Sequence, residues 1–207
     1  GYSMTVASSY PGFEKITLDD GHWFFVGRLP DRLVLGPAAF ESLWMLHPAD
    51  FPMIHLHGQL RKIPRWQQAY GADYHFSGQT SVALPVLPSL EPFYDWTRAA
   101  IDERLNGLLL NWYDAILGHY IGPHRDSTRN MVPGAPIVTI SLGEERTFRL
   151  TRKREDRNQV HDFEAEDGAV FIMPYDTNIV WKHGVPKRAR YRGRRVSITA
   201  RAFEPRV

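Results

Sequence analysis

The sequence predicts a mixed α+β fold that is mainly β and is built as a sandwich or a barrel. From Leu108 onward, short apolar runs alternate with turn residues, and many short strands at such spacing are typical of these architectures. Before that point, two segments place their apolar residues at helical spacing instead. Because the chain has 207 residues and is 43% hydrophobic, we expect a single domain with a sizeable core.

The N-terminal half is expected to carry the helices. Residues 1–36 mix Pro, Gly and short apolar runs, which predicts an irregular extension with room for one strand. A helix is expected from Pro37, because proline suits the first turn, and its apolar face includes Leu43 and Trp44. A second helix is expected from Pro92 to Leu105. Residues 47–90 are rich in Pro, Gly and His and predict loops and short strands, so 37–107 should supply helices and recognition loops.

The C-terminal half is expected to form the β core, over residues 108–203. Apolar runs bounded by turn residues predict strands at 108–113, 136–142, 146–151, 160–164, 169–173, 177–182 and 195–203. No internal repeat or low-complexity segment interrupts them. The helices of the N-terminal half and these strands together give the α+β class.

Composition excludes several classes of function. The chain has no cysteine, so disulfides, thiolate metal sites and a cysteine nucleophile are excluded. No stretch approaches the roughly 20 apolar residues of a membrane span, and no signal peptide follows Met4. The net charge of +2 is too small to indicate nucleic acid by itself. We expect an intracellular protein, in the cytoplasm or in a eukaryotic nucleus, that acts as a monomer.

The stretch from Leu108 to Asp126 ends in a candidate metal-binding pair. In a strand, residues two apart point to the same side, so His124 and Asp126 present an imidazole and a carboxylate together. Two His and one carboxylate on one face are typical of non-heme Fe(II) oxygenases, and His183 could supply the second imidazole. Two alternatives stay open: a surface turn with a His–Asp hydrogen bond, and a His183 that is only packed beside Trp181.

The last expected strand alternates without a break. Val196, Ile198, Ala200 and Ala202 lie on one face, while Arg195, Ser197, Thr199 and Arg201 lie on the other. Two arginines and two hydroxyls on one face indicate a site for a dicarboxylate, since guanidinium groups bind carboxylates bidentately. The alternative is a solvated sheet face. Because six residues of strand span about 20 Å, both arginine side chains must reach inward to hold one small diacid.

At these residues the sequence resembles the AlkB-like dioxygenases that depend on Fe(II) and 2-oxoglutarate. The resemblance runs from about Pro64 to Phe203. It implies a double-stranded β-helix, or jelly roll, with the N-terminal helices packed on one sheet. The motifs that carry it, in chain order, are Pro64-Arg65, Tyr74-His75-Phe76-Ser77-Gly78, Asn111-Trp112-Tyr113, His124-Arg125-Asp126, Pro133-Gly134-Ala135-Pro136-Ile137, Thr177-Asn178, Trp181-Lys182-His183 and Arg195-Val196-Ser197-Ile198-Thr199-Ala200-Arg201.

The resemblance also implies the roles of the site residues. His124, Asp126 and His183 would bind Fe(II). Arg195 would bind the distal carboxylate of 2-oxoglutarate and Arg201 the end near the iron. Asn111, Tyr113 and Thr199 would complete the cosubstrate site. With O₂, such a site hydroxylates a C–H bond and releases succinate and CO₂, and hydroxylation of an N-methyl group ends in formaldehyde and the free base.

For the substrate, the resemblance implies a nucleobase flipped out of the stack. Phe76 would lie on one face of that base and the His124 ring on the other. Arg65, Tyr74, Ser77 and Thr128 would line the same pocket. Thr128 stands where the DNA-repair branch carries an acidic residue, and His57 stands where duplex-reading members insert an apolar aromatic wedge. Both departures weaken the expectation of a nucleobase substrate.

Three functions therefore stay open. The leading one is an oxidative dealkylase of alkylated nucleic acid, with DNA favoured over RNA. The second is a 2-oxoglutarate-dependent hydroxylase or demethylase of a small molecule or a protein side chain. The third is a catalytically inactive binding module. Two basic clusters, Lys187–Arg194 and Arg152–Arg157, could contact phosphates or be solvated loops.

Overall fold

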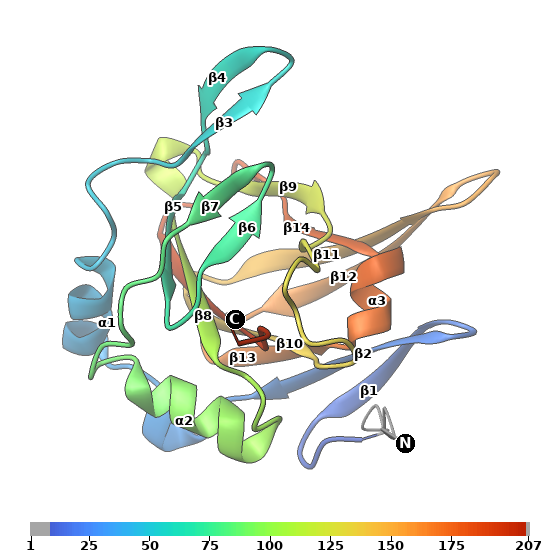
Figure 1. Cartoon of the computed structure of the whole chain (residues 1–207), viewed down its shortest axis with the longest axis horizontal. Helices are drawn as coiled ribbons and strands as arrows, with labels where there is room; N and C mark the ends of the chain where they lie inside the picture. Colours follow the sequence, from blue (N-terminus) through green and yellow to red (C-terminus); the bar gives the residue numbers. More distant parts are fainter. Residues whose placement is uncertain (1–8, 206–207) are drawn as a thin grey trace.

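The computed structural model describes residues 9–205, so residues 1–8 of the expected N-terminal extension lie outside the described part. Most of the strands in the described chain belong to two antiparallel sheets (Figure 1). The larger sheet has seven strands, in the order β1 (Glu14–Asp19), β2 (His22–Arg28), β13 (Ala169–Met173), β10 (Ile137–Gly143), β15 (Arg194–Arg201), β8 (Gly107–Asp114) and β5 (Trp66–Tyr70).

The smaller sheet has four strands, in the order β12 (Asn158–Ala165), β11 (Arg146–Lys153), β14 (Lys182–Val185) and β9 (Ile121–His124). A buried cluster joins the two sheets, because Phe148 and Leu150 of β11 belong to the same cluster as Leu109 of β8 and Phe171 of β13. The protein is therefore mainly β, and its two facing sheets are consistent with a jelly-roll core.

Two short ribbons stand outside these sheets. β3 (Met53–Leu56) pairs with β4 (Gln59–Lys62), and β6 (Tyr74–Phe76) pairs with β7 (Gln79–Ser81). In Figure 1 the β3–β4 ribbon extends away from the body of the protein. Every residue of β4 is exposed, so this ribbon buries little of its own surface.

The strands β8 and β15 separate the core from the site. On the side away from the cavity, these strands pack Trp112, Val196 and Ile198 into one buried cluster. Their neighbours Asn111, Tyr113 and Arg195 point to the other side, where the cavity lies. Successive side chains of a strand point to opposite faces of the sheet. The strands β8 and β15 therefore contribute apolar side chains to the core on one face and polar side chains to the cavity on the other.

The helices are short. α1 (Pro37–Trp44) and α2 (Glu91–Ala100) contribute Leu43, Trp44 and Phe93 to the cluster that holds Trp112. The indole Nε1 of Trp112 donates a hydrogen bond to the carbonyl of Leu43 at 3.1 Å. Two single-turn 3₁₀ helices and a third α-helix complete the set: η1 (Asp31–Leu33), η2 (Ala115–Leu117) and α3 (Tyr175–Val180).

Three expectations for these elements were wrong. The strand expected at 177–182 is replaced by α3, in which Trp181 N–H donates to the Thr177 carbonyl at 2.8 Å. The helix expected as far as Leu105 ends at Ala100, although Leu105 is buried. Residues 14–28, where an irregular extension with room for one strand was expected, form two paired strands, β1 and β2, which extend the large sheet through β13.

Every helix in the described part of the chain is too short or too polar to span a bilayer.

Candidate metal and cosubstrate site

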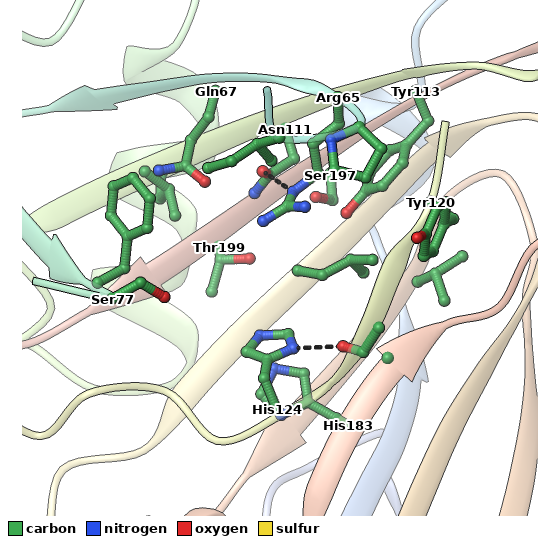
Figure 2. Close-up of a pocket in the computed structure, with 18 of the residues that line it drawn as sticks. Arg65, Gln67, Ser77, Asn111, Tyr113, Tyr120, His124, His183, Ser197 and Thr199 are labelled. Carbon is green, nitrogen blue, oxygen red and sulfur yellow. Dashed lines mark hydrogen bonds between the residues drawn. The ribbon is translucent and has the colours of Figure 1, made fainter. Parts of the chain in front are cut away.

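A cavity of about 780 Å³ opens between the two sheets. Its lining comes from β8 and β15 of the large sheet, from β9 and β14 of the small sheet, and from the β3–β4 and β6–β7 ribbons. Figure 2 shows Asn111, Ser197 and Thr199 on one side and His124 and His183 on the other. The cavity therefore brings together residues that are far apart in the sequence.

His124 and His183 lie side by side because their strands pair in a particular register. In the β9–β14 ladder, His124 and His183 are direct partners, and their ring centroids are 4.2 Å apart. Gly184 allows this approach: a Cβ atom there would lie 2.9 Å from the Ile121 carbonyl oxygen. The Nδ1 atom of His124 lies 2.9 Å from the Gly122 carbonyl oxygen, which leaves Nε2 facing the cavity.

Asp126 completes the group, although it lies just beyond β9 and not within a strand as expected. Its Oδ1 atom is 3.4 Å from His124 Nε2 and 3.3 Å from His183 Nε2. Two hydrogen bonds with the Asn178 side chain fix the backbone of Asp126. The Asp126 N–H donates to Asn178 Oδ1 at 2.9 Å, and Asn178 Nδ2 donates to the Asp126 carbonyl at 3.1 Å. Tertiary contacts with α3 therefore position this carboxylate.

The Asp126 carboxylate is ionised and fully buried. Burial alone would raise its pKa, but the charge of Arg201 and contacts with the two His rings lower the pKa well below its ordinary range. Arg201 donates to Oδ2 from Nε at 2.9 Å and from Nη2 at 2.7 Å. Burial and the neighbouring His124 lower the pKa of His183, which favours the neutral ring that a metal needs.

The donor set fits a divalent cation. Asp126 Oδ1 is buried and has no hydrogen-bond partner, which is costly for a carboxylate oxygen unless a cation is bound. The three ligand atoms lie within 4.8 Å of one another. Cis ligands on an octahedral first-row metal lie about 3 Å apart, close to the two measured separations. Two imidazoles and one carboxylate leave coordination positions open, as in non-heme Fe(II) sites.

Arg195 is the second polar side chain that lacks partners. It is only 1% exposed, and its Nη1 and Nη2 atoms are buried with no hydrogen bond. Its Nε donates to Ser141 Oγ at 3.0 Å, and its guanidinium lies 5.1 Å from the centre of the Tyr113 ring. A buried guanidinium with two free nitrogen atoms facing a cavity is suited to bind a carboxylate.

The floor between Arg195 and the His rings is a row of polar side chains. Asn111 pairs with Ser197 on β15 and with Gln67 on β5, so three strands each contribute one residue. Arg65 Nε donates to Asn111 Oδ1 at 3.0 Å, the upper dashed line in Figure 2. Thr199 lines the same floor, and Tyr113 lies beside Arg195. All five residues expected at the cosubstrate site therefore face one cavity.

The residues expected to touch the substrate divide into two groups. Arg65, Tyr74, Phe76 and Ser77 line the cavity. Phe76 stacks on Tyr74 with ring centroids 5.9 Å apart, and Arg201 lies 4.3 Å over the Tyr74 ring. Burial, and then the charge of Asp126, raises the pKa of Tyr74, so its hydroxyl keeps its proton. Thr128 is the exception.

Thr128 is exposed and does not line the cavity. Its backbone carbonyl accepts a hydrogen bond from the Met131 N–H at 3.0 Å, and its neighbour Ser127 reaches the cavity instead. The strand β9 ends at His124. The directions of the side chains that follow therefore cannot be predicted from the alternation of side chains along a strand.

Both basic clusters are partly used for internal contacts. Arg152 forms an ion pair with Asp19 at 2.6 Å, and Asp19 also accepts a hydrogen bond from Trp181 Nε1 at 2.8 Å. Arg194 forms an ion pair with Glu41 at 3.2 Å. These two arginines therefore hold elements of the fold together. Lys153, Arg154 and Arg157 extend from the β11–β12 hairpin, beyond that contact.

Sequence reasoning missed three residues of the site. Ser141 orients Arg195, Asn178 orients Asp126, and Gln67 lines the cavity with a buried Nε2 atom that has no partner. A polar residue inside an apolar strand was the available signal for Ser141 and Gln67. Asn178 stood in the Thr177-Asn178 motif of the resemblance but was given no role, because its contact joins residues 52 positions apart.

The chain is similar in sequence to proteins of a known family. The family model of the 2OG-Fe(II) oxygenase superfamily matches residues 47–201. The chain is an AlkB-like dioxygenase of that superfamily. DNA oxidative demethylase ALKBH2 of Mus musculus is 32% identical over 162 residues, which cover 73% of this chain and 67% of that protein. The Homo sapiens protein of the same name is 32% identical over 158 residues, 72% of this chain and 60% of its own length.

A solved structure shows the same fold as this AlkB-like chain. The structure of OsALKBH1 matches it with a TM-score of 0.53 over 92% of this chain and 100% of that chain. Sequence identity is 15%, so this likeness concerns the fold alone. Membership in the superfamily implies Fe(II) and 2-oxoglutarate, and the His–Asp–His group and the unpartnered arginine are compatible with both.

Proposed function

We propose that this chain is an Fe(II)- and 2-oxoglutarate-dependent oxidative dealkylase that removes methyl or other alkyl groups from bases of DNA. One observation carries the chemistry: the buried Arg195 Nη atoms line the cavity without hydrogen-bond partners, and the buried Asp126 Oδ1, also without one, lies beside the two His rings that line it. The proposal for DNA rests on relatives about 32% identical that are named DNA oxidative demethylases. The chain would act as one domain, with residues 108–203 as its catalytic core.

Each site residue has a proposed task. His124, Asp126 and His183 would hold Fe(II). Arg195 would bind the distal carboxylate of 2-oxoglutarate, and Arg201 the end near the metal while it orients Asp126. Asn111, Tyr113 and Thr199 would hydrogen-bond the cosubstrate. With O₂, the loaded metal would supply the oxidant that hydroxylates an alkyl C–H bond, while 2-oxoglutarate becomes succinate and CO₂.

The chain's remaining contribution would be to position the base and to exclude water. Phe76 has one ring face against Tyr74, which leaves the other face to stack on a base. Tyr74 is a hydrogen-bond donor at neutral pH, as any tyrosine with an ordinary pKa is, and its raised pKa extends this to alkaline pH. Leu109, Phe148 and Val185 make part of the lining apolar and help to exclude solvent. A hydroxylated N-methyl group is a hemiaminal, which breaks down to formaldehyde and the free base.

The test is the release of formaldehyde and succinate in the presence of Fe(II), 2-oxoglutarate and ascorbate. The substrates are DNA oligonucleotides that carry 1-methyladenine, 3-methylcytosine, 1-methylguanine or 3-methylthymine, together with unmethylated strands and RNA of the same sequence. Formaldehyde equal to succinate with at least one methylated DNA would support the proposal. Succinate at one slow rate in every tube would instead favour the second candidate, a hydroxylase of a small molecule or a protein side chain.

A further inference from the structure

The cavity carries more positive charge than its proposed ligands need. Among the described residues that line it, six are Arg or Lys and none is Asp or Glu: Arg61, Lys62, Arg65, Arg125, Arg195 and Arg201. Asp126 is not among the lining residues, and its Oδ2 atom already accepts two hydrogen bonds from Arg201. Charges in a partly closed cavity are screened less than on an open surface. The field at the substrate position is therefore positive.

Arg65 is a cation of the lining that the proposed metal and cosubstrate leave unmatched. It lines the cavity beside Tyr74 and Phe76 and points inward next to Asn111 and Tyr113 (Figure 2). The groups that support its charge are tyrosines, and within the described chain it forms no ion pair with a carboxylate. Burial lowers its pKa, but a guanidinium keeps its proton in proteins. Its charge thus remains available to a bound base.

Loading the site does not remove this excess. The two negative charges of 2-oxoglutarate would be matched by Arg195 and Arg201. The charge of Asp126 offsets only half that of Fe(II). Arg65 then adds a further positive charge, and Arg61, Lys62 and Arg125 surround the mouth. No carboxylate in the lining is left to bind a cationic ring.

Apart from Arg65, the polar groups expected to meet the base are uncharged. Ser77 and Ser127 line the cavity, and their hydroxyls can donate or accept a hydrogen bond. They cannot neutralise a positive charge. A neutral base with ring carbonyl groups, in contrast, can accept hydrogen bonds from Arg65 and from these hydroxyls. The lining therefore matches carbonyl-bearing neutral rings better than cationic ones.

We infer that this cavity selects uncharged alkylated bases, such as 1-methylguanine and 3-methylthymine, over the cationic bases 1-methyladenine and 3-methylcytosine. The inference rests on the proposed dealkylation and narrows its substrate class. The four bases form two pairs of similar shape. 1-Methylguanine and 1-methyladenine are both N1-methyl purines, while 3-methylthymine and 3-methylcytosine are both N3-methyl pyrimidines. Within each pair one amino group is replaced by a carbonyl and the charge changes at neutral pH, while 1-methylguanine also has a 2-amino group and 3-methylthymine a 5-methyl group.

The experiment compares each pair in one DNA sequence by two measurements. The first is the formaldehyde release rate of the Fe(II)- and 2-oxoglutarate-loaded enzyme. The second is the affinity of the loaded enzyme under anaerobic conditions, by fluorescence anisotropy. We expect about a tenfold or greater preference for the neutral member of each pair in both measurements. Equal or tighter binding and equal or faster turnover of the cationic members would overturn the inference.

Raising the pH gives an internal control. The cationic bases lose the proton of their amino group in the alkaline range, whereas 1-methylguanine and 3-methylthymine have no proton to lose there. The ratio of rates within a pair cancels the pH dependence of the enzyme itself. We expect the preference for the neutral member to shrink as the pH rises. A ratio that does not change with pH would show that shape and not charge decides, and would contradict the inference.

Two variants at Ser127 test the same point from the protein side. Ser127→Asp adds a carboxylate to the lining, and Ser127→Asn adds a neutral group of the same size. Only Ser127→Asp should move the preference toward the cationic bases, by several-fold in rate and affinity. Identical shifts in both variants would contradict the inference. Absence of formaldehyde from every methylated strand would instead refute the proposed function, and the anaerobic affinities would still report the charge preference.

Discussion

The two ends of the cavity are built in different ways. The end with the metal and cosubstrate residues lies on or next to strands of the two main sheets, where Asn111, Asp126 and Arg195 are each less than 7% exposed. The end that would meet nucleic acid lies on two isolated ribbons, and Leu56 and Leu60 of the β3–β4 ribbon are 47% and 57% exposed. Position at the first end is fixed by sheet register, and at the second by little more than the ribbon itself.

We expect the buried end of the cavity to carry out the chemistry and the ribbon end to recognise the nucleic acid. The buried end contains charged atoms without partners, so its residues are costly to the fold and are explained by ligands. The ribbon end contains solvated side chains, so its residues can change with little effect on stability. We therefore expect variants at the first end to change activity and stability together, and variants at the second end to change binding alone.

The largest effect is expected from Asp126→Ala. It removes the anionic metal ligand and should abolish turnover, measured as succinate and formaldehyde release. It also leaves Arg201 buried without its partner, so stability should fall by about 3–5 kcal/mol in chemical denaturation.

His124→Ala removes a ligand and leaves the Arg201 pair intact, so it should abolish turnover in a folded protein. The control Asp176→Ala removes an exposed carboxylate and should behave like wild type. Normal activity of His124→Ala would remove the metal assignment.

Arg195→Ala should have the next largest effect. The variant loses a charge-assisted contact with the distal carboxylate of the cosubstrate, which is worth about 2–5 kcal/mol when buried. We expect the KM for 2-oxoglutarate to rise by roughly a hundredfold, while the Fe(II) requirement changes little. Arg149→Ala, at an exposed arginine paired with Asp162, is the matched control. An equal rise in both requirements would show that Arg195 serves the fold and not the cosubstrate.

His119 tests the boundary between the two ends, because its ring packs edge-on against Trp66 of β5 and Phe51 of the segment before β3. Burial lowers the pKa of His119 to about 4, aided by Arg146 and Arg65 and opposed by Asp114. Between an ordinary pKa of 6.5 and about 4, the unfolded chain binds a proton that the folded protein does not, so stability must fall as the pH falls through that range.

The expected loss from this residue is up to about 3 kcal/mol between pH 7 and pH 4. His119→Asn keeps an acceptor near the position of Nδ1, which accepts a hydrogen bond from the Asp114 N–H at 3.0 Å. Denaturant unfolding at both pH values should show a smaller pH-dependent loss in the variant than in wild type. The same loss in both proteins would mean that other groups govern acid stability.

Features of the fold and the site that depend on neighbouring residues could be predicted from the sequence, whereas those that depend on contacts between distant residues could not. The alternation of Arg195, Ser197, Thr199 and Arg201 was predicted from the period of a strand, and all four line the cavity. The positions of His183 and Thr128 could not be predicted in that way. His183 meets His124 through the register of two strands about 60 residues apart, which local patterns do not encode.

The failures have the same cause. The residues at 177–182 looked like a strand, because Ile179, Val180 and Trp181 are apolar and two of them are β-branched. Contacts with distant segments override that preference: the Thr177 hydroxyl donates to the Trp23 carbonyl at 2.8 Å, and Asn178 binds Asp126. Thr128 was assigned from the resemblance, four residues after His124, and it lies outside the cavity lining, beyond the end of β9.

The smallest effect on stability is expected from the double variant Leu56→Ser with Leu60→Ser on the β3–β4 ribbon. Both side chains are already largely in water, so the free energy of unfolding should change by no more than about 0.5 kcal/mol. Affinity for methylated duplex DNA should nevertheless fall several-fold, because exposed apolar side chains on a projecting ribbon can insert between base steps. Affinity for single strands should change less, since no stacked duplex must be opened.

Val160→Ser, at another exposed apolar residue on β12, is the control for general surface effects. If the ribbon variant binds duplex DNA like wild type, the ribbon has no part in recognition, and the division between the two ends is wrong on the recognition side. If it instead loses more than about 1 kcal/mol of stability, the ribbon is held by the body of the protein more firmly than its exposure indicates. Retained stability with weakened duplex binding would place recognition on the element that the fold constrains least.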